Sequence, residues 1–110
     1  MEMANECVEK LTLDPNDVPA REKLAQLLAE RLRQAEQGLE QLTLLLNLPD
    51  QPDAKRAEWL TLAAKWHIDY RQDFDTGRNM LERVIREFPQ SADAISARRK
   101  MQALDLEQRG

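Results

Sequence analysis

The residues most able to do chemistry in this sequence are one histidine, one cysteine and a short aspartate-rich stretch. His67 is the only histidine, so a metal site on its helix would need a second ligand three or four residues away. Those positions hold Ala63, Ala64, Tyr70 and Arg71, and none of these is a convincing metal ligand. We therefore expect a packed or rim histidine and no bound metal.

The stretch Asp73-x-Asp75-x-Gly77 has the spacing of the first ligands of a calcium loop. A loop that began at Asp73 would need a bidentate glutamate at the position where Val84 stands, so we expect no calcium site.

The sequence has no pattern of a phosphate-binding or catalytic motif. The three glycines lie too far apart to cradle a phosphate, and no serine or cysteine has a general base at a spacing that predicts an activated nucleophile. We therefore predict that the protein is not an enzyme and has no cofactor. The two serines near the C-terminus, Ser91 and Ser96, are expected to be a helix cap and a surface residue.

The net charge bears on the kind of partner, and the single cysteine bears on covalent cross-links. The formal net charge is −4, and the only basic triplet, Arg98 to Lys100, lies on one turn of a predicted terminal helix. A nucleic-acid-binding protein usually carries a basic stripe, so we expect no nucleic-acid partner and a solvated triplet. Cys7 is the single cysteine, so it makes no intrachain disulfide and suits a small packed apolar position. The segment has no signal peptide or run long enough to insert in a membrane, so its localisation stays open between the cytoplasm and a soluble cell-envelope domain.

The elements that position these side chains are predicted to be helices. Leu, Ala, Glu, Gln and Arg dominate the composition and favour helices, whereas β-branched residues are sparse and no segment has the pattern of a strand. Prolines and aspartates predict a loop at residues 47–53, and Asp75 is expected to cap the helix that follows it. Apolar residues recur at helical spacing in six stretches, at residues 5–13, 20–32, 36–46, 54–71, 75–88 and from 92 onward.

The helix at residues 54–71 is apolar over more than half of its circumference, so we expect it to contact neighbours on two sides. Its side chains fall into three groups at about 100° per residue. One apolar arc holds Ala57, Leu60, Ala64 and Ile68, the second holds Trp59, Ala63, Trp66 and Tyr70, and a continuous polar face holds Glu58, Thr61, Lys65 and Asp69.

The prolines indicate an internal repeat. Pro15, Pro52 and Pro89 are 37 residues apart, and each is followed five residues later by an alanine. Self-similarity at a fixed spacing of about 20–50 residues is typical of stacked supersecondary units, which usually present a surface rather than run a reaction.

The repeated pattern resembles the tetratricopeptide repeat, a family of antiparallel helix pairs about 34 residues long. The match is best at residues 72–89 and implies that Gly77 is the small residue where two helices cross. It departs from the family in length, since Gly38 and Gly77 are 39 residues apart. The matching positions in the second helices are Gly77, Leu81, Val84, Ile85 and Pro89, with Gly38, Leu42, Leu45 and Leu46 in the earlier unit, and those in the first helices are Ala20, Leu24, Ala25 and Leu28, with a poorer fit for Leu62, Ala63 and Trp66.

The resemblance implies an all-α fold of about six helices, with antiparallel hairpins stacked as a short right-handed superhelix. Residues 1–110 would form one domain. Within it, residues 1–13 are the second helix of a partial preceding repeat, 17–47 are repeat 1, 53–88 are repeat 2, and 91–106 are a capping helix. The first helix is then either a lone N-terminal helix or the start of a segment from a longer protein, and we expect the latter.

In function, the resemblance implies a protein–protein interaction scaffold that binds a peptide or partner helix in a concave groove, with no chemistry of its own. Large aromatic side chains dominate binding hot spots, but such stripes also fill helical cores, and both interpretations stay open for Trp59 and Trp66. The alternatives are a structural helical domain that self-associates, as in a homodimer, and an accessory domain of a larger protein. The ending Phe88-Pro89-x-Ser91 resembles repeats of bacterial cell-envelope assembly proteins, which suggests a bacterial source. The predicted groove residues are Glu22, Gln26, Arg33, Trp59, Ala63, Trp66 and Tyr70.

Overall fold

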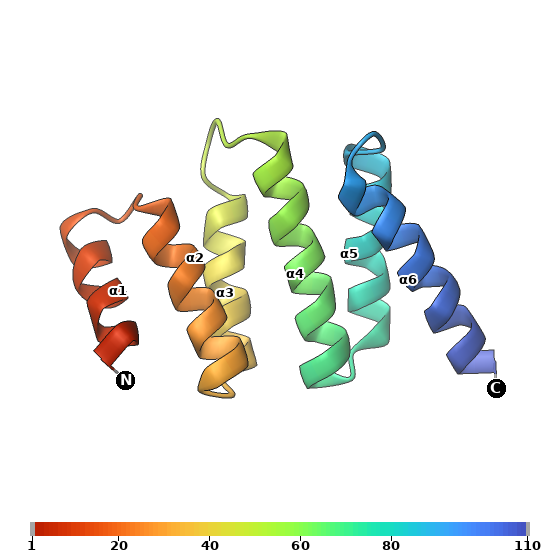
Figure 1. Ribbon diagram of the computed structural model, residues 1–110, viewed down its shortest axis with the longest axis horizontal. Helices are drawn as coiled ribbons and strands as arrows, with labels where there is room; N and C mark the ends of the chain where they lie inside the picture. Colours follow the sequence, from red (N-terminus) through yellow and green to blue (C-terminus); the bar gives the residue numbers. More distant parts are fainter. Residues whose placement is uncertain (1, 110) are drawn as a thin grey trace. The chain divides into compact units, whose positions relative to one another are not determined.

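The structure, a computed structural model, describes residues 2–109, and within them it contains helices and no strands (Figure 1). This confirms the predicted all-α fold and the number of helices. The chain divides into two compact units, unit 1 at residues 1–50 and unit 2 at residues 51–110. The elements in chain order are α1 (Glu2–Leu13), α2 (Val18–Gln26), the π-helical turn η1 (Leu27–Arg31), α3 (Ala35–Leu46), α4 (Asp53–Arg71), α5 (Phe74–Glu87) and α6 (Ala92–Arg109).

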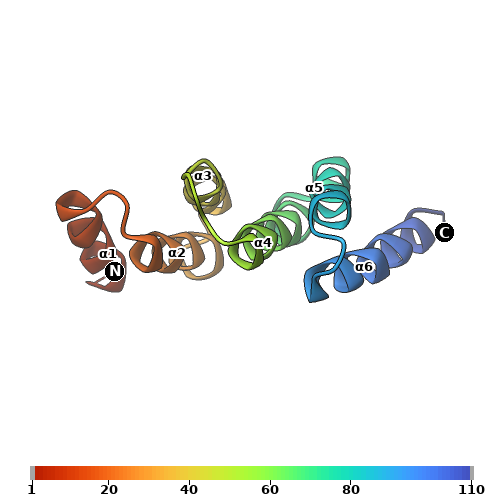
Figure 2. The ribbon, with the colours of Figure 1, turned by 90° about the horizontal axis from the view of Figure 1, so that it is seen from above.

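Unit 1 is built from α1 and an antiparallel hairpin of α2 and α3, which lie side by side in both views (Figures 1 and 2). α2 begins where Asp17 accepts a hydrogen bond from the Ala20 backbone N–H at 3.1 Å, with Pro19 in the first turn. An aspartate cap and an early proline are both favourable at a helix start. Cys7 is buried as a small apolar residue, as predicted. The rest of the unit 1 core is leucine and alanine: Ala20, Leu24, Ala25, Ala29, Leu39, Leu42 and Leu45.

The predicted helix at residues 20–32 is confirmed, but its last turn is wider than an α-helix. Residues 27–31 form a π-helical turn, in which the Leu32 N–H donates to the Leu27 carbonyl at 2.9 Å. Arg33 then takes a left-handed backbone with φ 55°, and the Gln34 N–H closes the turn on the Leu28 carbonyl at 2.7 Å. A left-handed residue after a helix end is the usual way to satisfy its last carbonyls.

Unit 2 contains a second antiparallel hairpin, α4 and α5, with α6 packed beside α5 (Figure 2). α4 ends with the same backbone geometry as the turn after η1. Gln72 is left-handed with φ 54°, and the Asp73 N–H donates to the His67 carbonyl at 2.9 Å. The cap predicted at Asp75 is wrong. α5 begins two residues earlier, and Asp73 accepts from the Thr76 N–H at 3.2 Å, because the left-handed Gln72 turns the chain at once. Asp75 lies in the first turn instead.

Both hairpins bring their helices together at a glycine. In unit 1, a Cβ at Gly38 would lie 2.9 Å from the Ala25 carbonyl oxygen and 2.9 Å from the Ala29 Cβ. In unit 2, a Cβ at Gly77 would lie 2.5 Å from the Ile68 Cγ1 and 3.3 Å from the Ala64 oxygen. The prediction that Gly77 stands where two helices cross is therefore confirmed, and Gly38 has the same place in its own hairpin.

The last helix begins as predicted and runs beyond residue 106 to Arg109. Ser91 is its cap: the Ser91 hydroxyl accepts from the Ala94 N–H at 3.0 Å and donates to the Phe88 carbonyl at 2.7 Å. The narrow apolar stripe of this helix is buried at Ala94, Ala97 and Leu104. Arg78 of α5 pairs with Asp105 of α6, and this adds a polar tie between the two helices.

Candidate functional site

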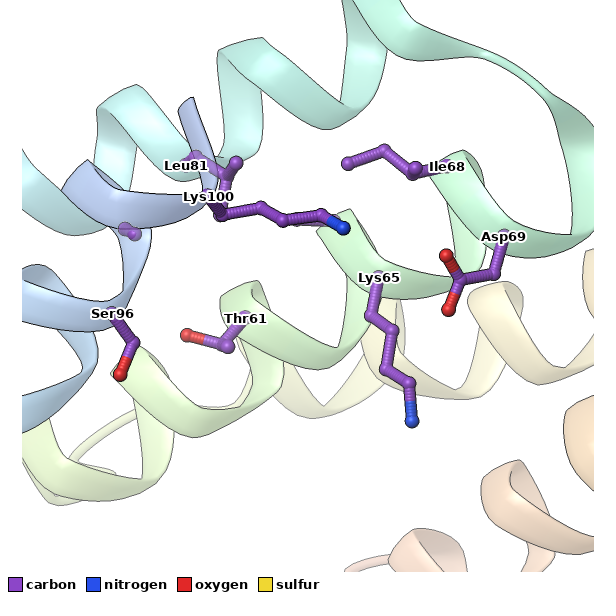
Figure 3. Close-up of a pocket in the computed structure, with 9 residues that line it drawn as sticks. Thr61, Lys65, Ile68, Asp69, Leu81, Ser96 and Lys100 are labelled. Carbon is purple, nitrogen blue, oxygen red and sulfur yellow. The ribbon is translucent and has the colours of Figure 1, made fainter. Parts of the chain in front are cut away.

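Unit 2 contains an open groove where α4, α5 and α6 meet, with a volume of about 320 Å³ (Figure 3). We call it the α4–α6 groove. It is mainly apolar, because buried side chains of all three helices contribute to it. Its lining residues are Thr61, Ala64, Lys65, Ile68, Asp69, Leu81, Ser96, Ala97 and Lys100.

The helices fix these side chains by simple periodicity. On α4, Ala64 and Ile68 are four residues apart and so lie on one face, as do Thr61, Lys65 and Asp69. α6 supplies Ser96 and Lys100 on the same four-residue spacing. The close approach at Gly77 holds α5 against α4, which places Leu81 one turn further along the same helix face.

Charged side chains stand on the α4 and α6 sides of the groove. Lys65 and Asp69 belong to α4, and Lys100 extends from α6 across the opening in Figure 3. Within residues 4–107, no ion pair or side-chain hydrogen bond engages any of these three. The Thr61 hydroxyl already donates to the Ala57 carbonyl at 2.7 Å, so it can only accept from a ligand. The groove therefore combines an apolar floor with two lysine ammonium groups that lack a partner in the described chain.

The groove residues predicted from the sequence lie in both units. Glu22, Gln26 and Arg33 belong to unit 1, where Arg33 lies in the turn after η1 rather than on a helix. The other four belong to α4. Trp59 and Trp66 have exposed fractions of 0%, Ala63 is buried, and Tyr70 is 47% exposed. At about 100° per residue, this stripe lies on the side of α4 roughly opposite Ile68 and Thr61. The stripe stays a prediction, and the burial of both indoles agrees with the core alternative.

His67 lies at the end of α4 near Asp73, the cap of α5. Its Nδ1 is buried without a hydrogen-bond partner and stands 4.0 Å from the Asp73 Oδ2, which is too long for a hydrogen bond. Burial lowers the pKa of His67 below its usual value, against the opposing effect of the Asp73 charge. Hydrogen bonds from Thr76 lower the pKa of Asp73. This pair is a helix corner with a neutral imidazole beside a capping carboxylate.

No group of three His, Cys, Asp or Glu side chains gathers as metal ligands within the part of the chain that the structure describes. Among the same residues, none of the helices combines the length and the apolar content that crossing a bilayer requires.

Sequence reasoning missed the α4–α6 groove although its residues were in view. The face of α4 that holds Thr61, Lys65 and Asp69 has the pattern of a solvated surface, and so does the triplet that ends at Lys100. Only the packing of α6 against α4 and α5 turns these two faces into opposite sides of one groove. No spacing in the sequence links Lys65 to Lys100, so no local signal points to the groove. No protein-family model, curated protein or solved structure matches the chain.

Proposed function

We propose that this protein is a non-catalytic protein–protein interaction scaffold of the tetratricopeptide type, and that the α4–α6 groove receives a peptide or helix of a partner. The observation that carries the proposal is the groove itself, an open and mainly apolar hollow of about 320 Å³ with unpaired charges at its edges. Its volume lies at the low end of the roughly 300–1,000 Å³ typical of ligand pockets.

The repeat character of the scaffold is supported by equivalent positions in the two hairpins. Gly38 and Gly77 are 39 residues apart, and the alanines whose carbonyls approach them, Ala25 and Ala64, have the same spacing. The left-handed residues Arg33 and Gln72 share it too. Two hairpins of one design are the element from which a stacked helical array is built.

A displayed peptide library tests the proposal. Peptides selected on the wild-type protein are re-measured on Ser96→Trp, which fills the groove from an exposed α6 position. The matched control is Ile95→Trp, because Ile95 is also exposed on α6 but does not line the groove. We expect Ser96→Trp to weaken binding at least about tenfold and Ile95→Trp to leave it unchanged. Selected peptides that bind both variants equally well, or a selection that enriches nothing, would contradict the proposal.

Self-association is the second candidate, because four of the six large exposed hydrophobic residues within residues 4–107 lie on α1 and α6. They are Val8 and Leu13 on α1 and Ile95 and Leu106 on α6. Light scattering after size-exclusion chromatography decides between a monomer and a dimer. A dimer that becomes a monomer in Leu13→Glu or Leu106→Glu would favour self-association through these helices.

A further inference from the structure

The chemistry of a ligand for the α4–α6 groove can be worked out from its lining. The floor is formed by Ala64, Ile68, Leu81 and Ala97, all buried in the fold. None of these side chains has a polar atom, so a polar group placed on this floor would lose its hydrogen bonds to water without replacement. The part of a ligand that enters the groove must therefore be apolar.

The edges of the groove select a negative charge. Lys65 on α4 and Lys100 on α6 line it from two helices, and neither has an ion-pair partner within residues 4–107. A lysine stem can lie along apolar surface while its ammonium group stays at the edge in water. An apolar segment in the groove would thus bring its flanking residues close to two ammonium groups, and carboxylates there would gain ion pairs.

The same lining favours a carboxylate over a phosphate. All nine lining residues lie within helices, at least four residues after each helix start, so the groove offers no helix N-terminus to bind a phosphate through backbone N–H groups. It also contains no arginine, the residue whose planar fork matches phosphate oxygens.

We infer that the α4–α6 groove binds a partner peptide in which apolar side chains are flanked by aspartate or glutamate, with the carboxylates paired to Lys65 and Lys100. This inference rests on the proposed function, and it adds the chemistry of the partner. Asp69 then acts as a specificity residue, since it limits the number of acidic groups on its side of the groove.

Four labelled peptides test the inference by fluorescence anisotropy, three of them unmodified and one phosphorylated. All share one leucine-rich core. The unmodified peptides carry glutamate, glutamine or lysine on both sides of it, and the fourth carries phosphoserine in place of glutamate. We expect the glutamate peptide to bind about tenfold more tightly than the glutamine peptide, with the lysine peptide weakest. The advantage should shrink as salt is raised, because exposed ion pairs are screened.

Variants of the charged residues locate the effect. Lys65→Gln and Lys100→Gln should each weaken the glutamate peptide about threefold and leave the glutamine peptide unchanged. Arg99→Gln is the matched control, since it removes one positive charge from an exposed α6 position outside the groove. Asp69→Asn should tighten the glutamate peptide about twofold or more.

The outcomes separate this inference from the proposed function. If library peptides lose binding in Ser96→Trp but carry no excess of acidic residues, or if the glutamate peptide fails to bind while they bind, the groove is a docking site and the carboxylate inference is overturned. Tighter binding of the phosphoserine peptide, or an equal loss in Arg99→Gln, would overturn it as well. If Ser96→Trp changes the binding of no peptide, both fail.

Discussion

Both units contain an antiparallel helical hairpin, but different side chains pack them. Unit 2 contains all five aromatic residues of the chain, whereas unit 1 has none and packs with leucine and alanine. Unit 1 also carries ten acidic and five basic residues, whereas unit 2 carries ten acidic and eleven basic residues. The open groove with unpaired lysines belongs to unit 2. Both units share the close helix crossing that the hairpin requires, whereas the α4–α6 groove belongs to unit 2.

The shared requirement is the glycine at the helix crossing, but what stands opposite it differs. Gly38 faces a carbonyl oxygen and the Cβ of Ala29, neither of which can rotate away. Gly77 faces Cγ1 and Cδ1 of the Ile68 side chain, at 2.5 and 2.8 Å from an added Cβ, and its nearest backbone atom is further off at 3.3 Å. The same substitution should therefore have a different cost in each unit.

The largest expected effect is that of Gly38→Ala. The added methyl group would overlap atoms fixed by the backbone of α2 and η1, so α3 must move away from them. Overpacking of this kind costs about 2–3 kcal/mol, more than the roughly 1 kcal/mol that alanine gains over glycine in helix propensity. Hydrogen exchange of the α2 and α3 amides should show the loss in unit 1.

Gln37→Ala is the matched control for Gly38→Ala, because Gln37 is the exposed neighbour on α3. It should leave the stability of unit 1 within about 0.5 kcal/mol of the wild type. Equal stability of Gly38→Ala and the wild type would contradict the close helix contact in unit 1.

Gly77→Ala should be milder, with a cost of about 1–2 kcal/mol, because the atoms nearest to the added methyl group belong to a side chain and not to the backbone. Trp59 and Trp66 both lie in α4, so tryptophan fluorescence during urea unfolding reports on unit 2. In a double-mutant cycle, Ile68→Ala removes the obstructing atoms, so the two substitutions together should cost less than their sum by about 1 kcal/mol. Additive costs would show that Ile68 is not what Gly77 accommodates.

Much of this architecture could be predicted from the sequence because it follows from local rules. Apolar spacing predicts the positions of the helices, and a loop with two prolines, at residues 47–52, separates α3 from α4. Gly77 was assigned to a helix crossing from its place in the repeat pattern, and the close contact with α4 confirms it. The helices and the loop depend on residues near one another in the chain, whereas the prediction for Gly77 depends on the repeat pattern.

The features that escaped prediction depend on contacts or backbone geometry with no local signature. Arg33 and Gln72 are left-handed although neither is glycine, and Gln72 moves the cap of α5 from Asp75 to Asp73. The groove forms only because α6 lies against α4. In the sequence, Lys65 and Lys100 each have the pattern of a solvated charge, and nothing there connects them. Long-range packing gives them a common site.

The helix caps should make similar stabilising contributions in both units, smaller than the effects of the glycine substitutions. Asp17→Ala removes the acceptor for the Ala20 N–H in unit 1, and Asp73→Ala removes that for the Thr76 N–H in unit 2. Hydrogen exchange at the start of α2 and of α5 should each rise only in its own variant. Asp75→Ala is the control in unit 2 and should matter less, since Asp75 is not the cap. A larger effect of Asp75→Ala would restore the cap position predicted from the sequence.

The smallest expected effect is a dependence on pH that only unit 2 shows, because the single histidine lies there. Burial holds the pKa of His67 below its usual 6.5 in the folded state, so the unfolded chain binds the proton more readily. The stabilising contribution of the neutral imidazole is therefore complete above pH 6.5 and declines as the pH falls from there through the folded pKa. Unfolding followed by tryptophan fluorescence at pH 7 and pH 5 should show this loss.

Two variants sharpen that result in opposite directions. His67→Leu should flatten the pH dependence of unit 2, since no titrating group remains at the buried position. Asp73→Asn keeps a good capping side chain but removes the charge that raises the pKa of His67, so the loss of stability between pH 7 and pH 5 should grow. If Asp73→Asn instead reduces that loss, Asp73 does not favour the protonated imidazole, and the 4.0 Å separation is not an electrostatic contact that the folded state uses.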